Sequence, residues 1–218
     1  MILTFRFISN AFCRAKSMTC VCFNPIFGRL AILFLLLLSA CSEEYVPKPK
    51  GYPRLVLPQH AYQSYADSSC PFTFDYPTYA KVEKDADFFG KKPENPCWLN
   101  LEFADINATI HLSYKPIGQK NTLAALIEDA HELNSKHVIK ANAMTDSLIS
   151  TPHGVHGLFY EIAGNTATST QFFLTDSSRH FLWAALYFKS RPNEDSIAPV
   201  VRFVRKDMER LIETFRWR

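Results

Sequence analysis

The stretch His180–Phe188, with the sequence HFLWAALYF, decides the fold of this chain of 218 residues. In a half-buried strand apolar and polar side chains alternate, because successive side chains point to opposite faces of the sheet. This stretch is apolar at nearly every position, so both of its faces need to be buried. Such a strand lies in the middle of a sheet that has other elements packed above and below it. The sequence therefore predicts a central strand and two covering layers.

Two amphipathic helices are predicted to supply these layers. In the first helix Asn121 or Thr122 is expected to be the N-cap, and an apolar stripe follows at helical spacing. In the second helix Asp195 or Ser196 is expected to be the N-cap, with Pro199 in the first turn. The stripes consist of Leu123, Leu126, Ile127, Ala130 and Leu133 in the first helix and of Val200, Val201, Val204, Met208, Leu211, Ile212 and Phe215 in the second.

The remaining strands are predicted from period-two alternation, which marks a strand with one buried face. Gly164-Asn165 is a tight-turn pair between two such runs and indicates a hairpin. Leu55–Leu57 is expected to add a short edge strand, because a proline beside an edge strand is tolerated. The alternating runs are Phe72–Tyr76, Leu99–Phe103, Ala108–Lys115, Gly157–Ile162 and Ala167–Leu174.

Together these elements predict an α+β fold, with a mostly antiparallel sheet of about six or seven strands covered by two amphipathic helices. The order of strands and helices resembles the Mog1/PsbP type of sandwich. A resemblance at the level of the fold implies no function by itself. The chain is long enough to bury one core, and we expect a single domain over residues 59–218.

The N-terminal segment has the features of a lipoprotein signal peptide. The apolar block Leu30–Leu38 is too short to span a bilayer and has the length of a signal-peptide core. Leu38-Ser39-Ala40-Cys41 resembles a bacterial lipobox, in which the cysteine receives a diacylglycerol and the chain is then cut before it. A buried apolar helix with an incidental cysteine is the alternative, but Ser42-Glu43-Glu44 turns the chain polar at once. The sequence therefore predicts a signal peptide over residues 1–40 and a lipid on Cys41.

Removal of residues 1–40 changes the charge of the protein. Four of the 24 basic residues and none of the 21 acidic residues lie in this segment, so the net charge changes from +3 to about −1. A near-neutral protein lacks the basic surface that nucleic-acid binding needs, and we exclude nucleic acid as a partner. Residues 41–58 contain four prolines and are predicted to form an extended tether between the membrane anchor and the domain.

Two cysteines, Cys70 and Cys97, follow Cys41 in the sequence. An exported protein meets oxidising conditions, so these two cysteines are expected to form a disulfide. A pair of buried free thiols is the alternative. Metal binding needs more ligands than this pair offers.

The sequence contains no motif of a known catalytic or cofactor site. A phosphate-binding glycine loop, a nucleophile elbow, a zinc-protease helix and a calcium loop are all absent from it. His153 and His156 could be two metal ligands, but no third ligand is close in sequence and a solvated loop is the simpler interpretation. Asp176, Ser177 and His180 come closest to a catalytic triad, although three residues of one turn rarely form a working relay. We therefore predict no catalytic residue, no metal and no cofactor.

Aromatic side chains are frequent in the second half of the chain, and a packed core is their first interpretation. A groove for an apolar ligand between sheet and helix is the alternative. The residues concerned are Phe172, Phe173, Phe181, Trp183, Tyr187 and Phe188.

Several strings of the sequence are longer and more specific than a generic domain would give. They are Pro47–Tyr52 (PKPKGY), Cys70–Pro77 (CPFTFDYP), Pro96–Trp98 (PCW), Leu112–Lys115 (LSYK), Gln171–Ser177 (QFFLTDS), His180–Leu182 (HFL) and Leu186–Phe188 (LYF). With these strings the chain resembles the gliding-motility lipoprotein D (GldD) family from about Tyr45 to Trp217. The resemblance implies an envelope lipoprotein that is required for gliding and linked to the type IX secretion system, without catalytic residues or cofactor.

We therefore expect a non-enzymatic accessory or assembly component of the gliding and secretion machinery, which works through contacts with other envelope proteins. The alternative is a lipoprotein that holds an apolar small ligand between sheet and helix. Ser42 is not the aspartate that retains lipoproteins at the inner membrane in well-studied systems, so the outer membrane is expected. Glu43-Glu44 leaves surface export open, and we favour the periplasmic face.

Overall fold

The computed structural model describes residues 54–85, 92–138 and 140–218, which belong to one compact unit spanning Tyr52–Arg218. No helix within these ranges is both long enough and apolar enough to cross a membrane. The predicted signal peptide and the predicted lipidation of Cys41 lie outside the described residues.

The described part of the predicted tether has no regular secondary structure. The expected edge strand at Leu55–Leu57 is therefore wrong. Leu55 and Val56 are exposed, and this segment pairs with neither of the two sheets found among the described residues. Its apolar side chains find no sheet face to cover, so the short apolar run does not become a strand.

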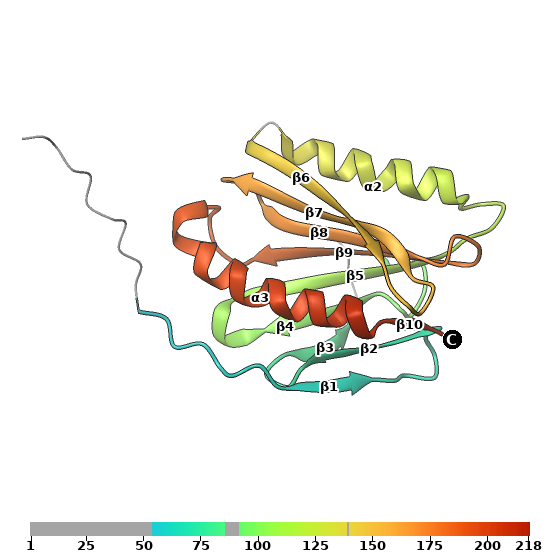
Figure 1. Ribbon diagram of the computed structural model, residues 1–218, viewed down its shortest axis with the longest axis horizontal. Coiled ribbons are helices and arrows are strands. Elements are labelled where there is room, and N and C mark those ends of the chain that lie inside the picture. Colours follow the sequence, from blue (N-terminus) through green and yellow to red (C-terminus); the bar gives the residue numbers. More distant parts are fainter. Residues whose placement is uncertain (1–53, 86–91, 139) are drawn as a thin grey trace, which may run out of the picture. The chain divides into compact units, whose positions relative to one another are not determined.

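The centre of the fold is an antiparallel sheet of seven strands, counted within the described residues (Figure 1). The strands follow one another in space in the order β3-β4-β5-β9-β8-β7-β6. β9 (His180–Phe188) is the middle strand, and its residues from His180 to Leu186 are all buried. This confirms the prediction of a central strand with two buried faces. The other elements of this layer are β3 (Lys81–Lys84), β4 (Leu99–Phe103), the 3₁₀ helix η1 (Ala104–Ile106), β5 (Ala108–Pro116), β6 (Ala141–Ser150), β7 (His156–Gly164) and β8 (Thr168–Thr175).

A second, three-stranded sheet in the described residues has the order β1-β2-β10. β2 (Phe72–Pro77) is the predicted aromatic strand and pairs with β1 (Tyr62–Tyr65) and with β10 (Arg216–Trp217). Trp217 lies opposite Phe72 in this register, so the last residues of the chain return to the start of the domain.

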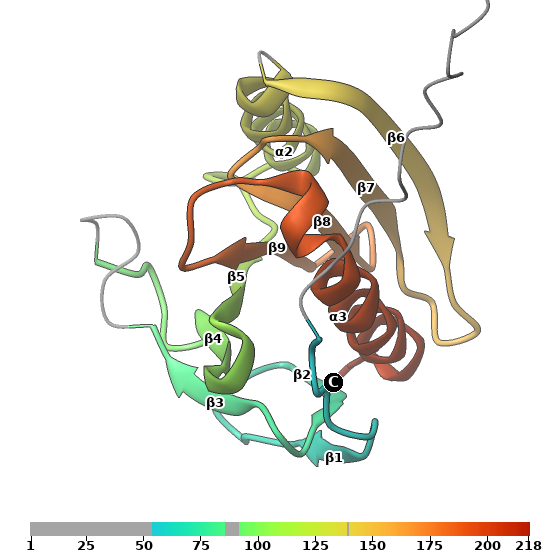
Figure 2. The ribbon, with the colours of Figure 1, turned by 90° about the vertical axis from the view of Figure 1, so that its left-hand side faces the viewer.

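The two faces of the large sheet are covered by α2 (Leu123–Val138) and α3 (Glu194–Thr214), as Figures 1 and 2 show. α2 packs over β6, β8 and β9. Alternate residues of β9 divide between two apolar clusters, one with each helix. Phe181, Trp183 and Ala185 lie in the α2 layer, whereas Leu182, Ala184 and Leu186 lie in the α3 layer. The arrangement is the predicted α+β sandwich.

The two layers differ in composition. The α3 layer holds most of the core aromatic rings, and Phe215 stacks on Phe72 and Phe74 with ring centres 5.7 and 6.2 Å apart. The α2 layer is smaller and contains buried polar side chains. Those of Ser113, Gln171 and Trp183 have polar atoms with no hydrogen-bond partner among the described residues.

Helix α3 begins earlier than predicted. Its N-cap is Asn193, whose Oδ1 accepts the N–H of Ser196 at 3.3 Å, so the expected cap at Asp195 or Ser196 is wrong. Pro199 is consequently the sixth residue of the helix and lies beyond its first turn. The first N–H of the helix donates to Oδ1 of Asn165 at 2.9 Å, which joins the β7–β8 hairpin to α3.

The predictions for α2 and for the hairpin are confirmed. Thr122 caps α2, because its Oγ1 accepts the N–H of Ala125 at 3.3 Å. The hairpin turns at Gly164, where φ is +114° and an added Cβ would lie 2.7 Å from the carbonyl oxygen of Lys140. Only glycine fits this position, since other residues rarely adopt such a φ.

Replacement of a leucine in β9 tests the role of the buried strand. Leu182 is fully buried, so Leu182→Ala is expected to lower the free energy of unfolding by about 2–5 kcal/mol through lost burial and a cavity. Leu148 of β6 is 87% exposed, so the matched variant Leu148→Ala is expected to change it by no more than about 0.5 kcal/mol. Urea denaturation of the domain without its signal peptide measures both. Equal effects of the two variants would contradict the assignment of β9 to the centre.

Candidate functional site

A buried carboxylate, Asp207 of α3, is the centre of a cluster of polar side chains. Its side chain is 1% exposed and lies within the apolar stripe of the helix. Burial of a carboxylate is costly unless hydrogen bonds compensate for the lost water. Three side chains supply these bonds, namely those of His60, Tyr62 and Tyr79. We call these four residues the Asp207 cluster.

Both carboxylate oxygens of Asp207 are occupied. Nδ1 of His60 lies 2.8 Å from Oδ1, and the hydroxyl of Tyr62 donates to the same oxygen at 3.0 Å. The hydroxyl of Tyr79 donates to Oδ2 at 2.7 Å. Because a carboxylate can only accept, Nδ1 of His60 carries the hydrogen of its bond. The imidazole of His60 also stacks on the ring of Phe203, with 4.4 Å between the ring centres.

The two phenols of the cluster are held in their neutral form. Burial, together with the negative charge of Asp207 and the hydrogen bond to it, raises the pKa of Tyr62 to about 12. Burial and the hydrogen bond to Asp207 raise the pKa of Tyr79 as well. Both phenols therefore remain hydrogen-bond donors at any physiological pH. The donors and acceptors of the cluster satisfy one another, so the cluster is suited to fastening two parts of the chain together.

The Asp207 cluster joins the beginning of the domain to its last helix. His60 and Tyr62 follow the described end of the predicted tether, and Asp207 is 147 residues after His60. The sequence analysis singled out none of the four residues. The sequence nevertheless contains one sign of a buried polar cluster. Asp207 is a charged residue within the apolar stripe of α3, three residues after Val204 and four before Leu211.

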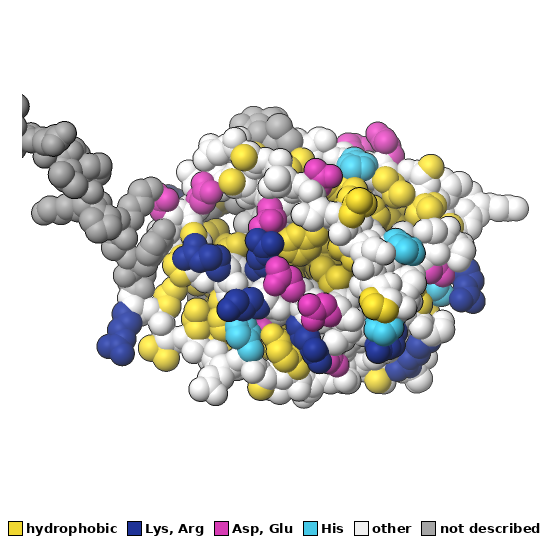
Figure 3. All heavy atoms as spheres, viewed as in Figure 1, with side chains coloured by type: hydrophobic (Ala, Val, Ile, Leu, Met, Phe, Trp, Pro, Cys, Tyr) yellow, Lys and Arg dark blue, Asp and Glu magenta, His cyan; other side chains and the backbone are white. Residues whose placement is uncertain are grey.

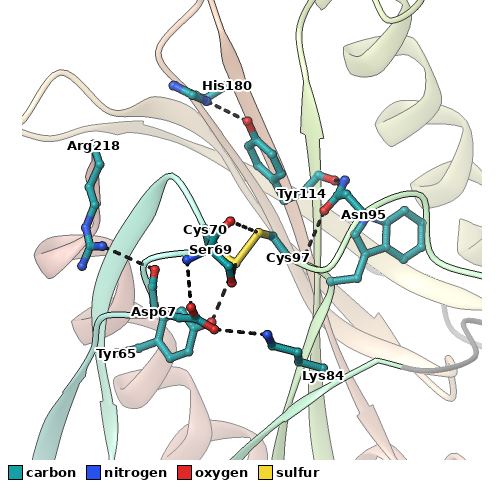
Figure 4. Close-up of a disulfide and its surroundings, with 11 residues drawn as sticks. Tyr65, Asp67, Ser69, Cys70, Lys84, Asn95, Cys97, Tyr114, His180 and Arg218 are labelled. Carbon is teal, nitrogen blue, oxygen red and sulfur yellow. Dashed lines mark hydrogen bonds and ion pairs between the residues drawn. A yellow bond between two sulfur atoms is a disulfide. The ribbon is translucent and has the colours of Figure 1, made fainter.

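The two cysteines lie just before strands of different sheets, and their side chains meet between them (Figure 4). Cys70 precedes β2 and Cys97 precedes β4, and a bond between their sulfur atoms joins Cα atoms 5.5 Å apart. This separation is within the ordinary range for a disulfide. Both side chains are buried. Oδ1 of Asn95 accepts the N–H of Cys97 at 3.0 Å, which fixes the backbone on that side. Oxidation of this pair in the cell stays a prediction.

The grouping of Asp176, Ser177 and His180 does not form a triad. Oδ1 of Asp176 accepts the backbone N–H groups of Ser178, Arg179 and His180 at 3.0, 2.8 and 2.8 Å. Nδ1 of His180 lies 2.9 Å from the hydroxyl of Tyr114, so the imidazole is bonded away from the turn. Burial opposes the charged form of Asp176, but the N–H groups outweigh it and lower the pKa to about 2. The carboxylate therefore stabilises the β8–β9 turn.

The remaining histidines of the described residues do not gather around one point. His153 and His156 are exposed, and Nδ1 of His131 lies 3.3 Å from the hydroxyl of Tyr160. Burial lowers the pKa of His111, whose Nδ1 is 2.6 Å from Oδ1 of Asn100. Within the described ranges, no group of three or more histidine, cysteine or acidic side chains is placed to hold a metal ion.

A small groove lies between α2 and the sheet and has a volume of about 90 Å³. Apolar side chains make most of its wall, and Lys115 and Asp129 belong to its lining. The indole N–H of Trp183 and the hydroxyl of Ser113, both from side chains of this lining, have no partner among the described residues. A cavity that holds benzene measures about 150 Å³. The groove is therefore large enough only for a small group.

The surface beside α3 is hollowed where the helix leaves β7 partly uncovered. Two hollows of about 180 and 310 Å³ adjoin the first and second halves of α3. Arg205 lines the second hollow and pairs with Glu161 of β7 and with Glu209. Figure 3 shows apolar side chains on this face with charged side chains of both signs around them. Because charges of both signs are present, this face offers no concentrated charge of one sign for a small ion.

The family model of the gliding motility lipoprotein GldD matches residues 42–217. The chain belongs to this family. The match begins at the residue after Cys41 and includes all the described residues except the last. The resemblance noted in the sequence is thus confirmed. Membership makes the chain a gliding-motility-related lipoprotein and associates it with the cell envelope.

No curated protein matches the chain at a significant level. Among solved structures, the solution structure of cyanobacterial PsbP (CyanoP) from Synechocystis sp. PCC 6803 is similar, with a TM-score of 0.43 and 13% sequence identity. The alignment covers 76% of this chain and 98% of that chain.

Removal of the central carboxylate tests the Asp207 cluster. Asp207→Ala leaves the half-buried hydroxyls of Tyr62 and Tyr79 and the imidazole of His60 without their acceptor. It is expected to lower the free energy of unfolding by about 2–4 kcal/mol. Glu209→Ala on the exposed side of the same helix is the control, with an expected change of no more than about 1 kcal/mol. Urea denaturation measures both. A similar small effect of the two variants would show that the cluster does not fasten the domain.

Thiol counting tests the disulfide. Under denaturing conditions without reductant, the mature protein is expected to show no free thiol from Cys70 or Cys97. Opening a loop with a sequence separation of 27 residues is expected to cost about 3–4 kcal/mol of stability in the chain-entropy model. The double variant Cys70→Ala/Cys97→Ala should therefore match the reduced protein in stability. Two free thiols in protein isolated from the periplasm would refute the pairing.

Acid denaturation tests Asp176. Its pKa of about 2 in the folded protein lies below the ordinary 3.8, so its contribution is complete above about pH 4 and is lost as the pH falls through 2. Asp176→Asn is expected to lower the free energy of unfolding at pH 7 by roughly 1–2 kcal/mol and to reduce the loss between pH 5 and pH 2. The control Asp105→Asn alters an exposed aspartate. A variant that loses as much stability in acid as the unchanged protein would exclude this role.

Proposed function

We propose that this chain is a lipid-anchored, non-enzymatic accessory or assembly component of the gliding-motility and type IX secretion machinery. The observation that carries the proposal is the GldD family match, which spans residues 42–217 and thus nearly all of the chain after Cys41. In this proposal the signal peptide of residues 1–40 is removed, Cys41 carries the lipid, and residues 41–58 form the tether. The domain faces the periplasm from the outer membrane.

The chemistry of the described residues supports a role in binding. Catalysis requires polar groups that are arranged to stabilise a transition state. The strongest polar grouping, the Asp207 cluster, has its carboxylate engaged by three donors of its own chain. The grouping of Asp176, Ser177 and His180 is engaged in turn formation. We therefore propose that the protein works through contacts with other envelope proteins.

A second candidate function rests on the groove under α2. The unpartnered N–H of Trp183 and hydroxyl of Ser113 favour a ligand that combines a small apolar group with a hydrogen-bond acceptor. Ligand-binding pockets for larger molecules usually measure about 300–1,000 Å³, so the groove of about 90 Å³ does not fit a lipid chain. Native mass spectrometry of the delipidated protein tests this candidate, because a small molecule that co-purifies would favour it.

Complementation of a deletion strain tests the main proposal. Deletion of the gene is expected to abolish export of type IX cargo, and spreading where the organism glides, and the unchanged gene restores both. Cys41→Ala is expected to lose fatty-acid labelling, membrane retention and complementation. Cys20→Ala, which alters another cysteine of the N-terminal segment, is the matched control and should complement. Normal export in the deletion strain would exclude the machinery component, and a labelled Cys41→Ala protein would exclude the anchor.

A further inference from the structure

The large sheet ends in two strands, β3 and β6, that differ in how they are protected. β3 has four residues, and two of them are lysines. Short length and charge are common devices that prevent an edge strand from pairing with another chain. β6 has ten residues, contains no proline and no lysine, and is exposed from Asn142 to Leu148. Its bulge lies at its beginning, between Ala141 and Ala143, so the second half is regular.

The register of β6 shows which backbone groups are free. The N–H of Thr151 donates to the carbonyl oxygen of Val155 in the loop that joins β6 to β7. Strand residues direct their backbone groups alternately to the two sides. The odd-numbered residues of β6 therefore bond to β7, and the even-numbered ones direct N–H and C=O to the open side. The second group includes Met144, Asp146, Leu148 and Ser150.

Nothing else in the described residues covers this side. β6 pairs with β7 and with no other strand of the described sheet. α2 packs over one face of β6 and leaves the edge open. Figure 2 shows the second half of β6 along the rim of the sheet, with no other labelled element outside it.

The side chains of the same residues define what would pair there. Met144 and Leu148 are 39% and 87% exposed, although both are apolar. Asp146 lies between them and is exposed, without an ion-pair partner among the described residues. Side chains that lie opposite each other on neighbouring strands stabilise a sheet when they are both apolar or oppositely charged. The edge thus presents the alternation apolar, acidic, apolar.

We infer that β6 is a docking edge for an extended segment of an envelope partner, and that this segment carries a basic residue between two apolar ones at alternate positions. The segment adds as an eighth strand beside β6. Its backbone satisfies the open N–H and C=O groups, and its basic side chain pairs with Asp146. The inference rests on the proposed function and specifies the kind of partner contact.

A second copy of this chain fits the edge less well. Antiparallel pairing of β6 with itself in the register that places Met144 opposite Leu148 would also place the Asp146 carboxylates of the two copies opposite each other. Like charges in opposed positions destabilise a sheet. A basic partner segment meets the same carboxylate with the opposite charge.

A designed peptide tests the inference on the full-length lipoprotein in detergent. The probe is a fluorescein-labelled undecapeptide, Thr-Val-Thr-Leu-Thr-Lys-Thr-Leu-Thr-Val-Thr, which has leucine two positions either side of lysine. The control is the nonapeptide Thr-Val-Thr-Val-Lys-Val-Thr-Val-Thr, in which the valines lie on the opposite face of the strand from lysine. Fluorescence anisotropy measures binding, and hydrogen exchange reports on the amides. The version with apolar residues two positions either side of lysine is expected to bind and to slow exchange at Met144, Asp146 and Leu148.

Charge reversal supplies the decisive comparison. Asp146→Lys is expected to weaken binding roughly tenfold, and a peptide with glutamate in place of lysine should restore it. Leu148→Pro removes one open N–H without removing a bond to β7 and is expected to weaken binding as well. Glu83→Lys on β3 is the control and should leave binding unchanged.

The outcomes separate this inference from the proposed function. Unchanged binding in Asp146→Lys, or no protection of the three amides, would overturn the docking edge. A dimer of the full-length protein that Leu148→Pro dissolves would assign the edge to a second copy. Asp146→Lys is also expected to reduce complementation of the deletion strain. If it complements fully while the deletion strain still fails to export, the docking edge is wrong and the proposed function stands.

Discussion

The fold depends on the burial of β9 on both faces. A strand without a polar face loses roughly 1.5–3 kcal/mol for each large apolar side chain left in water. Covering elements are therefore needed on both sides of the sheet, which explains why α2 lies on one face and α3 on the other. The backbone groups of a buried strand also need partners on both edges. β5 and β8 supply them along most of the length of β9.

The two layers that cover the faces of the large sheet differ in how they are packed. In the α3 layer, aromatic rings from β2 pack against Phe215 after the helix, and the Asp207 cluster fastens the start of the domain to the helix. In the α2 layer, Ser113, Gln171 and Trp183 keep buried polar atoms without partners, and each such atom costs about 1–3 kcal/mol. On the α3 side, Nε2 of His180 and Nε1 of Trp217 are likewise without a partner among the described residues, so unsatisfied polar atoms lower the stability of both layers.

The sequence predicted the strands and helices that have one apolar and one polar face, and also the strand that is apolar on both faces. β9 was recognisable from its continuous apolar run, and β4 from the alternation that its buried residues produce. β5 was recognisable because apolar and polar side chains alternate in its sequence, although most residues on both of its faces are buried. β1, β3 and β10 have four residues or fewer, so no periodicity can develop in them. β6 is long but exposed from Asn142 to Leu148, and a strand with so little buried surface carries no hydrophobic pattern. The Asp207 cluster was missed because tertiary packing alone brings His60 and Asp207 together.

In the proposed function, the two ends of the domain have different tasks. His60 and the segment before it lie with the small sheet of β1, β2 and β10, whereas β6 is the last strand at the far end of the large sheet (Figures 1 and 2). Strands in a sheet are about 4.8 Å apart, so β3 and β6 are separated by roughly 29 Å across the six spacings between them. In the proposed function, the anchor holds the domain near its first strands. A partner at β6 would then be bound at the opposite edge, through backbone bonds that continue the same sheet to the buried strand β9.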